Sequence, residues 1–333
     1  MTVEGLTRAE RAGPPAPRLP LVERLARARV LGKSPLRAQL RIGEWVWDRL
    51  PRSARNLGPL KAYGRLMNAL VRMQGDRRQF FGTYFLRNRP QVQMIRRLAG
   101  VRRHDGATTI AILGCSLGAE VYSIAWSVRS AHPDLDLRMH AVDISAEALE
   151  IGREGVYPLG ISDFAMEPLF ERMTDSERHE MFDREGPELR VKPWIKEGIA
   201  WCLGDAGEPD LVSDIGRHDI VVANDFLCHM DPTGAERCLR NIGRLVQPGG
   251  YLVVSGVDLD VRTRVANSLR WVALQDSIEA IHDGDRSLRE SWPWRYWGLE
   301  PLDRSRPDWT VRYASVFQIG TTSPASNVRG GGT

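Results

Sequence analysis

The chain has 333 residues, of which 42% are hydrophobic and 26% are charged, a composition typical of globular proteins with a sizeable core. It contains no run of 18 apolar residues and no signal-peptide pattern, so we expect neither a membrane-spanning helix nor secretion, and predict a cytoplasmic protein. The four cysteines lie far apart without C-x-x-C spacing, which argues against a structural zinc site and a disulfide framework.

The net charge of +4 is unevenly distributed along the chain. Residues 1–100 carry 21 basic and 6 acidic side chains, which leaves a net charge of about −11 on the remainder. A basic N-terminal region can attract an anionic partner, such as an acidic protein segment, but solvated arginine-rich helices have the same composition. The region lacks the interleaved aromatic residues of a nucleic-acid-binding surface, so we expect no nucleic-acid partner.

Composition divides the chain into four segments. Residues 1–20 and 321–333 have the Pro-rich or Gly-rich composition of disordered ends. Residues 21–100 are rich in Leu, Arg and Ala with helical spacing, which predicts an N-terminal helical domain. In residues 101–320 strand-like and helix-like segments alternate, which predicts one α/β domain with a parallel sheet.

The elements of the α/β domain are predicted in chain order. Strands are expected at 108–113, 137–142, 199–203, 219–223 and 251–255, and helices at 119–129, from 146 after an N-cap at Ser145, and at 235–245. Residues 158–198 interrupt the alternation and are too long for an ordinary loop. We therefore expect an insertion at about 158–198 that holds a helix and has room for a small hairpin.

A glycine-bearing turn follows the first strand. Gly114, Ser116 and Gly118 allow a tight turn and a close approach of the backbone to a ligand, and Glu120 follows at the start of the helix. A dinucleotide site has G-x-G-x-x-G, whose glycines and helix dipole serve a pyrophosphate. A carboxylate at this turn suits a cationic ligand better, such as S-adenosylmethionine, which carries an amino group and no phosphate.

Asp143 stands where the second strand ends. In nucleotide-type folds an acidic side chain at this position accepts hydrogen bonds from the ribose hydroxyls, although a strand-end aspartate can also cap the next helix. Together with the turn, Asp143 favours an adenosine-containing cofactor.

Residues 114–125 read GCSLGAEVYSIA and resemble the cofactor turn GCSTGEEPYSIA of the chemotaxis-receptor glutamate methyltransferases, the CheR family. The resemblance continues at separate points between about residues 60 and 257. The family patterns T-x-F-F-R, A-T-D-I, G-x-Y, R-V-K-P and F-x-x-x-N-L resemble residues 83–87, 141–144, 155–157, 190–193 and 201–206.

The resemblance implies a Rossmann-like class I methyltransferase sheet with an N-terminal helical domain and a small insertion, S-adenosyl-L-methionine as cofactor, and methyl transfer to a receptor carboxylate. It places Thr83, Arg87, Glu120, Asp143, Asp205 and Ala206 in the cofactor pocket. The candidate set is completed by Gly114, Ser116, Gly118, Ile144, Asn224 and Asp225.

The sequence departs from the family pattern at one point, which the resemblance places at the acceptor end of the pocket, where the methyl acceptor would bind. Residues 224–231 resemble the family's R-N-V-x-I-Y-F-D, with Asp225 at the asparagine and His229 at the tyrosine. A carboxylate acceptor is already an anion, whereas a hydroxyl gains from a nearby base, and an imidazole with a pKa of about 6.5 is suited to that role. His229 is therefore the candidate base, or alternatively a structural hydrogen-bonding residue. Arg87 is the second candidate catalytic residue, because it can orient a carboxylate.

Three functions follow from these residues. The main interpretation is O-methylation of a small-molecule or saccharide-like acceptor; the alternatives are carboxyl methylation of a protein and a non-catalytic homologue that binds cofactor or partner. No metal ligand set is evident, and the oligomeric state is not indicated.

The aromatic stretch at 292–301 either forms a wall of an acceptor pocket or packs in the core.

Overall fold

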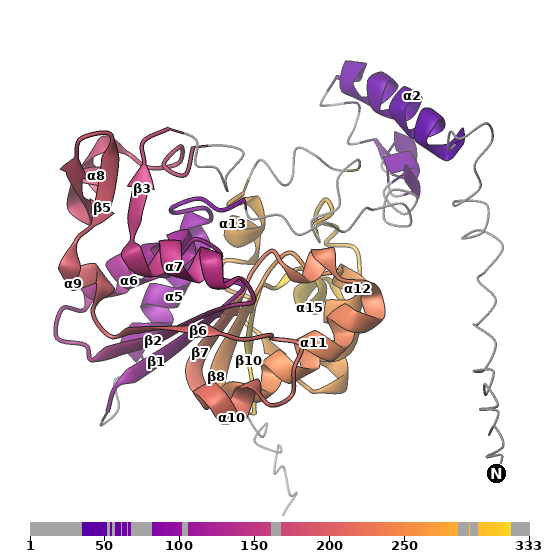
Figure 1. Ribbon diagram of the computed structural model, residues 1–333. Coiled ribbons are helices and arrows are strands. Elements are labelled where there is room, and N and C mark those ends of the chain that lie inside the picture. Colours follow the sequence, from indigo (N-terminus) through magenta and orange to yellow (C-terminus); the bar gives the residue numbers. More distant parts are fainter. Residues whose placement is uncertain are drawn as a thin grey trace, which may run out of the picture. The chain divides into compact units, whose positions relative to one another are not determined.

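The computed structural model describes residues 35–51, 54, 57–60, 62–64, 66–67, 82–101, 106–160, 168–285, 293 and 299–320 (Figure 1). The chain separates into two compact units, Met1–Gly75 and Asp76–Thr333. In the first unit, α2 (Pro35–Arg49) carries the buried Trp47, whose ring stacks on Tyr63 with centroids 6.3 Å apart. Within the described part of the chain, no helix has the length and apolar character needed to cross a membrane.

The second unit is built on a seven-stranded sheet with the order β6-β2-β1-β7-β8-β10-β9. The strands are β1 (Thr108–Leu113), β2 (Leu137–Asp143), β6 (Ile199–Leu203), β7 (His218–Ala223), β8 (Val246–Val254), β9 (Val272–Ala273) and β10 (Val316–Gln318). The five strands from β6 to β8 in this order pair in parallel, and β10 is antiparallel to both of its neighbours. The predicted α/β fold with a mostly parallel sheet is confirmed.

Alternating side chains of the strands enter two apolar clusters, one on each face of the sheet. Ile110 and Ile112 of β1 pack with residues of α5 (Arg89–Val101) and α6 (Ala119–Ala131). Ala111 and Leu113 pack with residues of α11 (Pro232–Arg244) and α12 (Leu259–Ser268). Figure 1 shows these helices on opposite sides of the sheet. Burial of both faces explains why the strands are apolar throughout.

The helix α5 belongs to the second unit, because the division between units falls before Asp76. Its buried face includes Val92, Ile95 and Leu98, and it contacts α6 and β7. The composition of the sequence places this segment in the predicted N-terminal helical domain (residues 21–100), and the predicted domain boundaries remain a prediction. The shorter helices of the unit are α7 (Ala146–Glu154), α10 (Leu211–Ile215), α13 (Ile278–Asp283) and α15 (Trp309–Tyr313).

The inserted segment forms a small antiparallel sheet of order β3-β5-β4 with two helices. Its elements are β3 (Val156–Pro158), α8 (Asp175–Met181), β4 (Phe182–Glu185), β5 (Glu188–Val191) and α9 (Pro193–Lys196). Phe85 packs among Tyr157, Phe170 and Phe182, with ring centroids 5.0–5.3 Å away. The insertion thus anchors the 83–87 segment, whose polar residues reach the site described below.

Two predicted starting positions differ from the structure by three residues or more. Helix α11 begins three residues before the expected start, because Asp231 is its N-cap and accepts hydrogen bonds from the backbone N–H groups of Thr233 and Gly234. Strand β8 begins at Val246 rather than 251, because a register shift between His218 and Ile220 lets the strand continue through residues 247–250.

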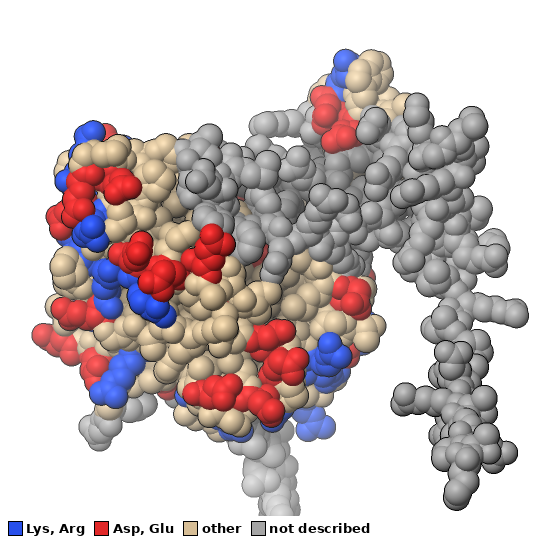
Figure 2. Space-filling view, in the orientation of Figure 1, with Lys and Arg blue, Asp and Glu red and all other residues tan. Residues whose placement is uncertain are grey.

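The C-terminal aromatic stretch at 292–301 lies largely outside the described residues, so both roles expected for it remain predictions. On the face of the second unit seen in Figure 2, acidic side chains lie among basic ones, in keeping with the negative net charge of residues 101–333.

Candidate active site

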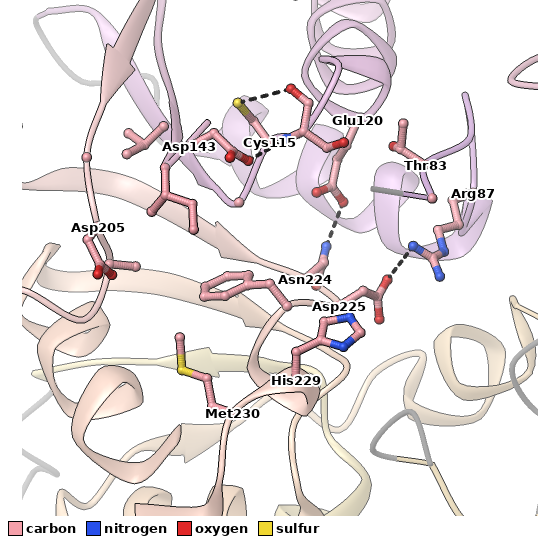
Figure 3. A pocket seen from close by; sticks show the side chains of 18 of the residues that line it. Thr83, Arg87, Cys115, Glu120, Asp143, Asp205, Asn224, Asp225, His229 and Met230 are labelled. Carbon is pink, nitrogen blue, oxygen red and sulfur yellow. Dashed lines mark hydrogen bonds and ion pairs between the residues drawn. The ribbon is translucent and has the colours of Figure 1, made fainter. Parts of the chain in front are cut away.

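A cavity of about 290 Å³ lies beyond the carboxyl ends of β1, β2, β6 and β7 (Figure 3). Ligands of open parallel sheets bind at this edge, where the strand order reverses. Every predicted site residue lines the cavity except Gly118. The lining comprises Gly82, Thr83, Tyr84, Arg87, Gly114, Cys115, Ser116, Glu120, Val142, Asp143, Ile144, Gly204, Asp205, Ala206, Asn224, Asp225, Phe226, His229 and Met230.

The turn after β1 has a backbone that requires its glycines. Gly114, Ser116 and Gly118 all have positive φ, at 66°, 49° and 84°. A Cβ on Gly114 would lie 2.7 Å from the Phe226 ring, and one on Gly118 would lie 2.6 Å from Trp201. Gly118 therefore serves the close packing of the turn beneath the cavity rather than the cavity wall.

Asp143 is buried and joins the end of β2 to this turn. Its Oδ2 accepts from the backbone N–H of Ser116 at 2.8 Å, and its Oδ1 accepts from that of Ser145 at 3.0 Å. A carboxylate has about four acceptor positions, so two backbone bonds leave capacity for two hydroxyl donors. Ser145 caps α7 by accepting from Ala148 N at 3.2 Å, as predicted. Asp143 thus combines the structural role with the capacity for a ribose.

The part of the cavity near Asp205 is largely apolar. Ile144 is 55% exposed there and leaves an apolar surface for a ligand. Phe226 and Met230 provide further apolar surface, and neither was selected from the sequence. Asp205 is exposed, and its Oδ1 accepts from Gly207 N at 2.7 Å. This environment suits a flat heteroaromatic group with a polar edge.

Glu120 is held in place by Asn224. Asn224 Nδ2 donates to Glu120 Oε1 at 2.6 Å and to Gln91 Oε1 at 2.9 Å. Its Oδ1 accepts from Gln91 Nε2 at 3.3 Å and from Ser255 Oγ at 2.9 Å. Both donors and both acceptor positions of the Asn224 amide are therefore used within the protein, so the amide positions Glu120 and has no further hydrogen bond to offer a ligand in the cavity that it lines.

Burial raises the pKa of Glu120 to about 7, with the Asp225 carboxylate adding to the rise and the Asn224 hydrogen bond and Arg87 opposing it. The charged form of this half-buried carboxylate is therefore destabilised, and an added cation would stabilise it. The site is therefore suited to an ammonium group next to Glu120. Gln91, which completes the network, was missed because an isolated glutamine on a helix carries no sequence signal.

Arg87 lies at the other end of the cavity from Asp205 (Figure 3). Its Nε donates to Asp285 Oδ2 at 2.9 Å, and its Nη1 lies 3.1 Å from Asp225 Oδ2. Burial acts to lower the pKa of Arg87, but the carboxylates of Asp225 and Asp285 outweigh it, so the pKa is raised. Arg87 therefore stays charged, as predicted for a residue of this type, and is already paired within the protein.

His229 is the last residue of a 3-10 turn, η1 (Leu227–His229), that follows β7. Its backbone N–H donates to Phe226 O at 3.1 Å, and the residue is half-buried at the cavity wall. Figure 3 shows its ring beside Asp225, on the Arg87 side of the cavity. The geometry places an imidazole at this end, where Thr83 and Tyr84 also contribute to the lining.

The family model for the CheR methyltransferase, SAM binding domain, matches residues 82–263, more than half of the chain. The chain belongs to the CheR methyltransferase family. S-adenosylmethionine is the cofactor of the matched domain, and the sheet with its flanking helices is a Rossmann-like class I methyltransferase fold. The match includes every predicted site residue.

Two curated relatives are each 25% identical to this CheR-family chain. One is an uncharacterized 104.1 kDa protein in the hypE 3' region of Rhodobacter capsulatus, matched over 51% of this chain and 18% of the relative. The other is the probable biofilm formation methyltransferase WspC of Pseudomonas putida, matched over 54% of this chain and 41% of the relative. The chain thus spans less than half the length of these relatives.

Solved structures with a similar arrangement include two methyltransferases. The N-methyltransferase NodS from Bradyrhizobium japonicum WM9, in complex with S-adenosyl-L-homocysteine, is 17% identical, with 57% of this chain and 78% of that chain covered and a TM-score of 0.33. An O-methyltransferase family protein from Burkholderia thailandensis is 16% identical, with 68% and 54% covered and a TM-score of 0.32. At these values the likeness carries no argument about function.

The residues present fit the cofactor. Glu120 offers a carboxylate for its ammonium group, Asp143 offers acceptor positions for its ribose, and Ile144 offers an apolar surface for its adenine. The cofactor needs each of these three kinds of group.

Proposed function

We propose that the protein is an S-adenosylmethionine-dependent methyltransferase that transfers the methyl group to a hydroxyl oxygen of a small-molecule or saccharide-like acceptor. The observation that carries the proposal is the position of His229, which lines the same cavity as Glu120 and Asp143, at the end where Arg87 and Asp225 meet.

In this proposal the cofactor extends along the cavity. Glu120 binds its ammonium group, Asp143 binds the ribose hydroxyls, and the adenine lies near Ile144, Ala206 and Asp205. The turn residues Gly114 and Ser116 lie against it, with Ser116 held by Asp143. Thr83 and Asn224 complete the wall, Asn224 through its hydrogen bond to Glu120.

The bound cofactor supplies a methyl group that is already electrophilic. The protein therefore has to hold the acceptor in line and accept one proton from its hydroxyl, without a covalent intermediate. A ring nitrogen of His229 accepts that proton, a role that contributes about 10²- to 10⁴-fold to a rate. Arg87, fixed by Asp225 and Asp285, is a positioning residue for the acceptor end.

A second candidate function is carboxyl methylation of a protein side chain, which family membership favours. A carboxylate acceptor has no proton to lose near neutral pH, so His229 would have no task as a base in that reaction. A non-catalytic homologue would bind the cofactor and transfer nothing.

The test has two stages. Calorimetric titration with S-adenosylmethionine and S-adenosylhomocysteine first establishes cofactor binding, and labelled methyl transfer from [methyl-³H]S-adenosylmethionine to the small-molecule and protein fractions of a cell extract follows. Label in the small-molecule fraction that resists mild alkali excludes a methyl ester, and the expected result is such a product with the methyl group placed on oxygen by mass spectrometry. Alkali-labile label in the protein fraction indicates methyl esters, and cofactor binding without any transfer indicates a non-catalytic homologue; either result contradicts the proposal.

The role of His229 is tested with His229→Gln. We expect the transfer rate to fall at least 100-fold while cofactor affinity changes less than threefold. His179→Gln, which alters an exposed histidine of α8, is the matched control and should retain full activity. If His229→Gln kept the wild-type transfer rate, His229 would not be the base.

A further inference from the structure

Two arginines and two aspartates form a cluster at the acceptor end of the cavity. Arg87 contacts Asp225 at 3.1 Å and Asp285 at 2.9 Å, and Arg172 Nη1 contacts Asp285 Oδ1 at 3.1 Å. Arg172 also donates to the backbone oxygen of Arg87 at 2.9 Å and lies over the Tyr84 ring, 4.4 Å from its centroid. The four charges therefore form one connected group.

The two positive and two negative charges of these four residues sum to zero, and the four side chains are mostly removed from water. The side chains of Arg87 and Arg172 are 21% exposed, that of Asp225 is 15% exposed and that of Asp285 is 6% exposed. Interactions between charges are much stronger in such a setting than in bulk water. An anionic group that approached Arg87 would be repelled by the Asp225 carboxylate, which already pairs with the same guanidinium.

The cluster also forms the wall between two cavities. Arg87 and Asp225, with Tyr84 and Glu120, line both the main cavity and a second one of about 40 Å³, which Asp285 also lines. The pair is therefore part of the boundary of the acceptor end and not a distant surface ion pair. An acceptor held near His229 lies within reach of this boundary.

Asp225 is held firmly in its position. Its φ is 62°, its backbone N–H donates to Ser255 O at 3.2 Å, and its Oδ1 lies 3.3 Å from Ser255 Oγ, whose single proton is shared with Asn224 Oδ1. Gly256 packs so closely that a Cβ there would lie 2.4 Å from Asp225 Cα. These contacts keep the carboxylate against Arg87, so the guanidinium is neutralised before any acceptor arrives.

We propose that Asp225 is a specificity-determining residue that cancels the charge of Arg87 and restricts the site to acceptors with no negative charge at the reacting end, namely neutral hydroxyl compounds. This inference rests on the proposed function, because it concerns the acceptor of that same site. It predicts that removing the Asp225 charge turns the acceptor end into an anion-binding site.

Propionate and propionamide are suitable probes, because they have nearly the same shape and differ in charge. Binding of each is measured by ligand-observed NMR at pH 8, for wild type, Asp225→Asn and the double variant Asp225→Asn/Arg87→Gln, with and without S-adenosylhomocysteine. Asparagine has the size of aspartate and tolerates positive φ, so the backbone at 225 should persist. Asp285→Asn is a second variant that unmasks the arginines from the other side, and Asp183→Asn, an exposed site on β4, is the control.

We expect wild type to show no preference for propionate, and Asp225→Asn to bind propionate at least tenfold more tightly relative to propionamide. The double variant should lose this gain, and Asp183→Asn should behave as wild type. A wild-type preference for propionate of tenfold or more overturns the inference. A propionate-to-propionamide ratio that Asp225→Asn leaves unchanged also overturns it, whatever Asp285→Asn does. The absence of propionate binding to wild type and to both variants overturns it as well.

The two proposals fail in different ways. If wild type does not bind S-adenosylhomocysteine in calorimetry, the proposed function fails, whereas the charge preference is still measured on the protein without cofactor. If the cofactor binds but the propionate ratio is unchanged by the substitutions, only the role of Asp225 fails.

Discussion

The side-chain amides of Gln91 and Asn224 hydrogen-bond to each other in both directions, at 2.9 Å from Asn224 Nδ2 to Gln91 Oε1 and at 3.3 Å from Gln91 Nε2 to Asn224 Oδ1. The two residues lie on α5 and after β7, 133 positions apart in the chain. Their pairing orients the amide that donates to Glu120.

Replacing Gln91 with leucine should weaken S-adenosylmethionine binding about tenfold, because Asn224 loses two hydrogen bonds and no longer holds Glu120 in one orientation. Calorimetric titration measures the change. Gln93→Leu, an exposed glutamine on the same helix, is the matched control and should bind as wild type does. Equal affinity of the Gln91 variant and wild type would show that Glu120 is positioned without this network.

Cofactor affinity should depend on pH through Glu120, whose pKa burial raises to about 7. The carboxylate must be ionised to bind an ammonium group, so affinity should fall as pH decreases below about 7, and binding near pH 6.5 should release a proton. Calorimetry in buffers of different ionisation enthalpy measures the number of protons released on binding. Glu120→Gln should bind weakly and without this pH dependence; proton uptake on binding to wild type would contradict the assignment.

Glu120 should also influence stability in the absence of cofactor. Its pKa is about 7 in the folded state against 4.5 for an ordinary glutamate, so the folded state binds more protons between these pH values. The free energy of unfolding should therefore decrease by roughly 3 kcal/mol as pH rises from about 4.5 to 7 on account of this group. Denaturant titrations of wild type and Glu120→Gln across this range should show a flatter profile for the variant.

Gly118→Ala should destabilise the protein by more than backbone strain alone. An alanine at this position would have to adopt a φ of 84°, and its Cβ would lie 2.6 Å from the Trp201 side chain. Gly186→Ala is a suitable control, because Gly186 has a φ of 61° but no atom within 4 Å of its added Cβ. We expect a loss of about 1 kcal/mol for Gly186→Ala and of about 2–4 kcal/mol for Gly118→Ala, measured by chemical denaturation. Equal losses would mean that Trp201 moves aside without cost.

Asp143→Ala should reduce cofactor affinity more than tenfold, because it removes both the ribose acceptor and the bond that fixes Ser116. Asp136→Ala, an exposed aspartate before β2, is the control. Titration with adenosine as well as S-adenosylmethionine separates the two contributions, since a ribose contact affects both ligands. If Asp143→Ala bound adenosine as tightly as wild type does, Asp143 would not be the residue that binds the ribose.

The sequence by itself determined the features that depend on short spacings. The strand before Gly114, the strand that ends at Asp143 and the cap at Ser145 each follow from the order of a few neighbouring residues, and the structure has all three. Because carboxyl ends of parallel strands meet at one edge of a sheet, these local patterns also indicated which residues would share a cavity.

Only the tertiary structure decided how those residues are paired. Gln91 reaches Asn224 because α5 contacts β7, the strand directly before Asn224, and Asp285 reaches Arg87 across 198 positions of the chain. Side-chain pairs of this kind depend on how helices pack against the sheet, and no local spacing encodes them. The charge of Arg87 was therefore readable from the sequence, whereas its neutralisation by Asp225 and Asp285 was not.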